Sequence, residues 1–219
     1  VYWLFGRFVT RAPRYMSRKA LANAEAVIDT SNAEGGFEYS DCYLYDNDAR
    51  FVFNFVRTSL NYGGIVANYV ESLGAERRDG VWHSQVRDNI SGEQFTVRAK
   101  VLINACGPYV DKHNQLSGQH TAHRHLFSKG IHLVVDRITE NQRILTFFAS
   151  DGRLFFVIPM GPKTCIGTTD TQVESPEVVV PHADRHFVLD NVNASLTLEK
   201  LLNLPSCIYA RFVVRPLTP

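Results

Sequence analysis

The stretch Ile103-Asn104-Ala105-Cys106-Gly107-Pro108-Tyr109 decides how the fold of this 219-residue chain is interpreted. It ends an apolar run, Lys100–Ala105, that has the composition of a buried strand. Gly107 then breaks the strand into a turn, and a glycine turn lets backbone approach a flat or charged ligand. On these residues alone, a structural strand-to-loop turn is the simpler interpretation and a ligand-binding turn is the alternative.

The segment before this stretch predicts a helix followed by a strand. The helix is expected to begin at Asp46 or Asn47 and to end at Gly63-Gly64, and a short strand is expected over Ile65–Val70. This step from helix to strand is typical of an α/β fold. The apolar residues at helical spacing are Ala49, Val52, Phe53, Val56 and Leu60.

A different pattern follows, in which short strand-like runs alternate with turn sequences. The turns Arg78-Asp79-Gly80 and Asn89-Ile90-Ser91-Gly92 contain the residues that favour tight turns. Together they predict a three-stranded antiparallel meander that leads into the buried run. The three runs are Leu73–Arg77, Val81–Arg87 and Phe95–Ala99.

The composition changes after Gly107. Residues 112–129 are rich in His, Gln, Ser and Gly and predict a loop between domains. Strands with one helix, Asp184–Leu202, then predict a second, sheet-based domain. The expected strands are Ile131–Val135, Leu154–Ile158, Thr164–Thr168 and Ile208–Val214, and at the other end of the chain helices are expected over residues 1–9 and from Ser17 to about Val27.

Composition excludes several classes of protein. The net charge is +1 and no run of five basic residues occurs, which argues against nucleic acid as the main partner. No stretch reaches the roughly 20 apolar residues that span a bilayer. Cys42, Cys106, Cys165 and Cys207 lack metal-site spacing and predict reduced, buried thiols. The spacing of His120, His123 and His125 also gives no metal signal, and Ser59 gives no hydrolase signal.

As a set, four motifs resemble the FAD-dependent glycerol-3-phosphate dehydrogenases. The match covers most of the chain beyond about residue 35 and includes Gly36-Phe37-Glu38-Tyr39-Ser40-Asp41-Cys42 and Asp48-Ala49-Arg50. The four motifs are Ile103–Tyr109, Ser128-Lys129-Gly130-Ile131-His132, Ile166-Gly167-Thr168-Thr169-Asp170 and Val214-Arg215-Pro216-Leu217.

The resemblance implies an α/β fold: part of a glutathione-reductase-like FAD-binding domain with the meander inserted, and an α+β substrate domain. The expected divisions are residues 1–115 with a leading helical segment, 116–210 for substrate, and 211–219 returning to the FAD domain. FAD is the implied cofactor. Its implied contacts are the backbone of Val70 at the adenine and Ala105, Cys106 and Gly107 at the pyrophosphate and flavin edge, although the family usually has Thr at Cys106.

The resemblance also places residues at the substrate. A lone His in an apolar strand is more often a core residue, but the match of Lys129-Gly130-Ile131-His132 to the family motif implies a substrate-pocket histidine, expected to be the base. Arg215 is expected to hold phosphate, with a structural ion pair as the alternative. Lys129 and Thr168 are expected to assist, although Asp170 could simply cap a turn there. Val213 stands where the family usually has Gly.

The implied reaction oxidises sn-glycerol 3-phosphate to dihydroxyacetone phosphate, with hydride passing to FAD and electrons to a quinone. The expected protein is cytoplasmic, peripheral on the inner face of the cell membrane, and a homodimer is one option for its assembly. The sequence lacks G-x-G-x-x-G and Gly-Gly-Lys-x-Thr-Thr, so we expect an internal fragment of a longer enzyme that does not hold FAD by itself. The alternatives are an amine or amino-acid oxidase of the same superfamily and a non-catalytic module that binds a phosphorylated metabolite.

Overall fold

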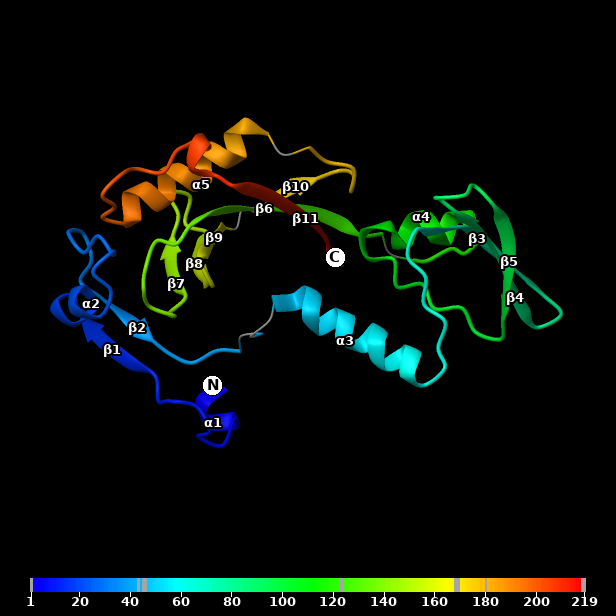
Figure 1. The fold of residues 1–219 in the computed structure, drawn as a ribbon, viewed down its shortest axis with the longest axis horizontal. Coiled ribbons are helices and arrows are strands. Elements are labelled where there is room, and N and C mark those ends of the chain that lie inside the picture. Colours follow the sequence, from blue (N-terminus) through cyan, green and yellow to red (C-terminus); the bar gives the residue numbers. More distant parts are fainter. Residues whose placement is uncertain are drawn as a thin grey trace. The chain divides into compact units, whose positions relative to one another are not determined.

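The computed structural model describes residues 2–42, 44, 47–122, 124–167, 170–179 and 181–217, apart from the side chains of Tyr2 and Asn47. The chain forms two compact units. The first comprises Val1–Arg11 and Ser40–Ala122, and the second comprises Ala12–Tyr39 and His123–Pro219. Figure 1 shows the elements of both units. None of the helices in the described ranges is long and apolar enough to cross a bilayer.

The first unit contains the predicted meander. Strands β3, β4 and β5 form a three-stranded antiparallel sheet, which confirms that prediction. Gly74 lies at a bulge in β3 with φ +124°, and a Cβ there would stand 2.5 Å from the carbonyl oxygen of Leu116, so only glycine lets the following helix pack this closely. The elements of this unit are α1 (Tyr2–Phe5), α3 (Asn47–Asn61), β3 (Val70–Arg78), β4 (Val81–Asp88), β5 (Gln94–Ala99), η1 (Gly107–Tyr109) and α4 (Val110–Leu116).

Two predicted strands of the first unit do not form. Residues 65–69 are irregular, and the run from Lys100 to Ala105 makes no strand. The side chains of Val101 and Ile103 are 69% and 81% exposed, so the prediction of a buried strand is wrong here. A strand requires a neighbour for its backbone N–H and C=O groups, and neither run is paired within the described ranges.

The second unit is built on a six-stranded sheet of order β10-β6-β9-β8-β7, with β11 paired to the other side of β6. A two-stranded sheet, β1-β2, and the short helix α2 accompany it. Its elements are β1 (Arg14–Ser17), α2 (Arg18–Ala24), β2 (Gly35–Glu38), β6 (Leu126–Asp136), β7 (Leu145–Phe148), β8 (Leu154–Met160), β9 (Lys163–Gly167), β10 (Thr171–Val173), α5 (His182–Ser195), η2 (Leu204–Ser206) and β11 (Tyr209–Leu217).

Strand β6 alternates between a covered and an open face of this sheet. Ile131, Leu133 and Val135 are at most 1% exposed and belong to one cluster with Val188 and Val192 of α5. Side chains alternate across a strand, so the residues between them point to the opposite face. Figure 1 shows α5 running along the sheet. We call the opposite face, which carries the half-buried His132, the open face.

The observed boundaries differ from the expected ones in several places. Residues 211–217, expected to return to the FAD domain, pair with β6 of the second unit. Residues 12–39 belong to the second unit, because Val27 and Ile28 pack on its core. The expected loop over residues 112–129 contains most of α4 and the start of β6. Helix α5 ends at Ser195, where Leu196 becomes extended and bridges to Ile28.

The prediction of reduced, buried cysteines is correct only in part. All four are free thiols, but Cys42 and Cys106 are exposed. Cys165 is buried and Cys207 is half-buried.

A buried carboxylate links α2 to the connection between β6 and β7. Glu25 directly follows α2, is 2% exposed, and accepts hydrogen bonds from Thr139 Oγ1 at 3.0 Å and Arg143 Nη1 at 3.2 Å. Arg143 also binds Glu38 of β2 at 2.9 Å, and the pKa of that carboxyl is lowered by Arg143 and then by Arg14. One guanidinium therefore holds the segment 12–39 at two points.

Replacing Arg143 by Met should lower the free energy of unfolding by about 2 kcal/mol, because Glu25 keeps its burial and loses its cation. Urea denaturation followed by circular dichroism measures this change. Lys163→Met is the matched control, since it breaks the exposed Lys163–Asp136 pair and should cost under about 0.5 kcal/mol. Equal losses in both variants would contradict the role given to Arg143.

Candidate functional site

The antiparallel pair β6–β11 brings the predicted site residues together. Arg211 pairs with His132, Val213 with Gly130, and Arg215 with Ser128. Directly paired residues of an antiparallel sheet point to the same face. His132 alternates with the buried Ile131 and Leu133, so this shared face is the open one. We call His132, Arg211 and Arg215 the basic row.

His132 lies over β9, and the sequence of β9 makes room for it. His132 pairs with Gly167, where a Cβ would stand 2.7 Å from His132 Cδ2 and 2.6 Å from the carbonyl oxygen of Ile131. Any side chain at Gly167 would therefore displace the imidazole. This glycine explains the Ile166-Gly167 motif by packing, which sequence analysis could not show.

The surroundings of His132 favour its neutral form. Burial lowers the pKa of His132 to about 4, helped by the positive charges of Arg211 and then Arg215. With this pKa the imidazole is neutral at pH 7, and one ring nitrogen carries a lone pair that can accept a hydrogen bond. The side chain is also only half-buried, so a ligand on the open face can reach it.

Arg215 has a carboxylate partner in this structure. Its Nη1 lies 3.4 Å from Asp170 Oδ1, and Asp170 also accepts a hydrogen bond from the Ser128 hydroxyl. The side chains of Arg215 and Asp170 are 34% and 61% exposed, so both remain accessible. The structural ion pair that was the alternative for Arg215 is therefore present, and it lies at the surface of the open face. Thr168 lies outside the described residues.

Lys129 does not join the basic row. It pairs with the buried Val214, is 5% exposed, and places Nζ 2.6 Å from Asp184 Oδ2 of α5. Its side chain therefore lies on the helix-covered face, opposite to His132. The expectation that Lys129 contacts substrate is corrected to a buried ion pair between sheet and helix.

Arg211 is the residue of this row that sequence analysis missed. It precedes Arg215 by four positions in a strand, so an even spacing places both side chains on one face. The spacing of Arg211 and Arg215 indicates a shared face only because β11 runs without a break through Arg215.

The residues expected at the cofactor all lie in the first unit. Asn104 accepts from the Cys106 N–H at 3.3 Å and donates to Val110 and Asn114, which holds the turn. Gly107 has φ +53°, and no heavy atom lies within 4 Å of where its Cβ would stand.

The turn at Ala105–Gly107 is accessible, which suits a close contact between its backbone and a ligand. Ala105 and Cys106 are small and exposed, so backbone and ligand can meet there as an FAD contact requires. Val70 is half-buried and begins β3, paired with Asp88. These residues fit the cofactor, and their contacts with it stay predictions.

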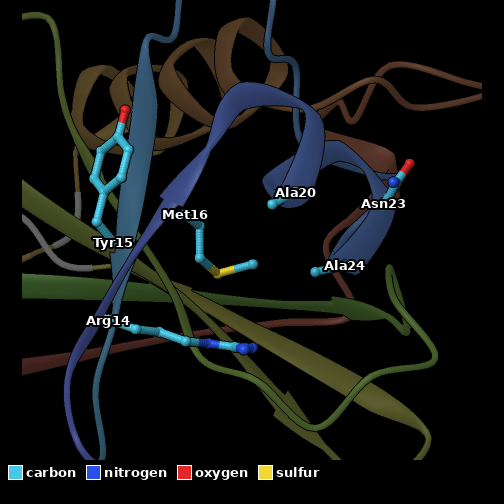
Figure 2. A pocket seen from close by; sticks show the side chains of 6 residues that line it. All are labelled: Arg14, Tyr15, Met16, Ala20, Asn23 and Ala24. Carbon is cyan, nitrogen blue, oxygen red and sulfur yellow. The ribbon is translucent and has the colours of Figure 1, made fainter.

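A separate cavity of about 310 Å³ lies beside β1 and α2. Figure 2 shows Met16 directed between the two elements, toward Ala20 and Ala24, with Arg14 beside it. Arg14 is bound to Glu38 at 2.6 Å. No residue of the basic row lines this cavity, so it is distinct from the candidate site.

Comparison with known proteins shows the family of this chain. The family model of FAD dependent oxidoreductases matches residues 5–218. The aerobic glycerol-3-phosphate dehydrogenase of Staphylococcus haemolyticus is 28% identical over 82% of this chain and 33% of its own length. The mitochondrial glycerol-3-phosphate dehydrogenase of Bos taurus is 32% identical over 78% of this chain and 25% of its own length. The chain thus spans a quarter to a third of these relatives.

Solved structures give the same result for the fold. The glycerol-3-phosphate dehydrogenase of Bacillus halodurans complexed with FAD superposes with a TM-score of 0.81, at 26% identity, over 95% of this chain and 44% of that one. The L-proline dehydrogenase of P. horikoshii, at 10% identity and a TM-score of 0.65, shows only a shared fold over 97% of this chain and 54% of that one. With its mixed α/β architecture and antiparallel sheets, the chain belongs to the FAD-dependent oxidoreductase family.

Proposed function

We propose that this chain is part of an enzyme that oxidises sn-glycerol 3-phosphate to dihydroxyacetone phosphate with FAD. The observation that supports this most is the basic row, which places an imidazole and an arginine of the expected substrate motifs on one open sheet face. The relatives that are named glycerol-3-phosphate dehydrogenases support the same substrate.

Arg215 would bind the phosphate through two parallel, charge-assisted hydrogen bonds. Asp170 holds the guanidinium on the open face, and Ser128 holds Asp170. In this proposal the hydroxyl of Thr168 adds a donor to the phosphate. The substrate then lies along the row from Arg215 toward His132.

His132 would remove the proton from the secondary hydroxyl. A ring nitrogen would accept that proton as the carbon is oxidised, and the lowered pKa of about 4 makes His132 a weaker base than an ordinary histidine. FAD, when bound, supplies the two-electron acceptor that alcohol oxidation requires. Ala105, Cys106, Gly107 and Val70 would hold this group by their backbones.

The wider setting is also proposed. The first unit would be part of a glutathione-reductase-like FAD domain, and a quinone would accept the electrons. The whole protein would be cytoplasmic and would lie on the inner face of the cell membrane, with a homodimer as its assembly. The resemblance of the motifs supports these points.

Arg215→Lys in the holoenzyme should lower kcat/KM for glycerol 3-phosphate roughly 10–150-fold, because Lys keeps the charge and loses the planar fork. Activity on unphosphorylated glycerol should change much less. Steady-state kinetics with both substrates measures the difference, and Arg98→Lys on the exposed strand β5 is the matched control. Equal losses on both substrates with an unchanged thermal melt would assign Arg215 to structure and would remove the argument for a phosphorylated substrate.

The NMR titration of the His132 ring should have its midpoint at about 4, well below the ordinary pKa of about 6.5. Because the unfolded chain binds this proton first, the contribution of His132 to stability falls as the pH drops from about 6.5 to 4. Arg211→Gln should raise the midpoint, since it removes a nearby positive charge, and Arg98→Gln should not. A midpoint near 6.5 in the parent protein would contradict the burial and charge assigned to this site.

A further inference from the structure

Arg153 lies outside the basic row, yet it contacts a residue that belongs to the candidate site. It directly precedes β8, and its Nε and Nη2 donate to Asp151 Oδ2 at 2.7 and 2.5 Å. Its Nη1 donates to the backbone carbonyl oxygen of Asp170 at 2.5 Å. The guanidinium carbon also lies 5.3 Å from the ring centroid of Phe187 on α5, which is a cation–π distance. Each nitrogen of this guanidinium therefore has a partner.

The register of β8 and β9 brings Arg153 to Asp170. These antiparallel strands pair Phe156 with Gly167. Arg153 stands three positions before Phe156, and Asp170 stands three positions after Gly167, so the same register sets the two residues opposite each other. The contact joins residues that are 17 positions apart in the chain, and it depends on this pairing of strands.

The other end of the contact is fixed to α5. Asp151 lies in the turn between β7 and β8, where the N–H of the neighbouring Ser150 donates to Asn191 Oδ1 at 2.6 Å. Asn191 is buried, and its Nδ2 donates to the carbonyl oxygen of Phe187 at 2.7 Å. Arg153 therefore extends toward Asp170 from a turn that the helix holds in place.

Asp170 carries this constraint to Arg215. Its carbonyl oxygen accepts from Arg153, whereas its carboxylate accepts from the Ser128 hydroxyl and lies 3.4 Å from Arg215 Nη1. The side chain of Asp170 is mostly exposed, and an exposed ion pair by itself restrains its two members weakly. Fixing the backbone of Asp170 removes part of that freedom before a ligand arrives, and such preorganisation strengthens binding.

We propose that Arg153 is a positioning residue for phosphate recognition: it fixes the backbone of Asp170, and Asp170 in turn orients the Arg215 guanidinium. Arg153 acts through Asp170 and not by contact with the substrate. This inference rests on the proposed function, because it uses Arg215 as the phosphate anchor.

Arg153→Met in the holoenzyme removes the donors and keeps an apolar side chain against Phe187. KM for glycerol 3-phosphate should rise about tenfold while kcat changes less than about twofold, because a misplaced anchor weakens binding of substrate and transition state alike. Arg153→Lys keeps a cation and one donor for Asp170, so it should recover part of this loss. Steady-state kinetics, with a thermal melt of each variant, measures these effects.

Arg78→Met is the matched control. Arg78 also donates through Nε and Nη2 to a carboxylate two residues away, that of Glu76 at 2.6 and 2.5 Å, but it lies on β3 in the first unit. This variant should leave KM and kcat unchanged. A rise in KM equal to that of Arg153→Met would show a general effect of losing such a pair and would overturn the inference.

The double variant Arg153→Met/Arg215→Lys tests whether Arg153 acts through Arg215. In the Arg215→Lys background, Arg153→Met should lower kcat/KM less than about twofold further, since residues that act as one unit do not have additive effects. Losses that multiply, or an unchanged KM in both Arg153→Met and Arg153→Lys while Arg215→Lys lowers kcat/KM, would overturn this inference and leave the proposed function standing. No loss in Arg215→Lys would overturn the proposed phosphate site, and this inference with it.

Discussion

The antiparallel pairing of β6 with β11 is the constraint on which the candidate site depends. It sets Arg211 opposite His132 and Arg215 opposite Ser128, over a register of nine paired positions. A slip by one residue would turn both arginines to the face that α5 covers. The apolar alternation of β6 prevents that slip, because Ile131 and Leu133 are fully buried and each stabilises the pairing by about 1.5–3 kcal/mol.

The two faces of this sheet separate structure from chemistry. On the covered face, Lys129 and Asp184 form an ion pair that ties the sheet to α5. On the open face, positive charges remain accessible beside a histidine whose pKa burial lowers to about 4. Two basic residues of the same motif, Lys129 and His132, therefore have different roles because they are an odd number of residues apart in a strand.

The first unit shows the limits of composition as a guide to burial. The predicted meander is confirmed. It could be predicted because its strands are adjacent in the chain and are joined by local turns. The runs 65–69 and 100–105 have strand composition, yet a strand of this kind needs partners from distant segments, and Ile65, Val101 and Ile103 are exposed. The turn at Gly107 nevertheless keeps the open, left-handed geometry that the sequence predicts for a ligand contact.

The amino-acid sequence by itself determined the family, the meander, most strands of the second unit, and the candidate roles of His132 and Arg215, because motifs and strand periodicity are local properties. Only the tertiary structure decided that Lys129 is a buried partner of Asp184, that Gly167 makes room for an imidazole, and that Arg211 joins the site. Each of these depends on the register between strands that are far apart in the chain. Register is set by which residues bury together, and no short stretch of sequence contains both partners.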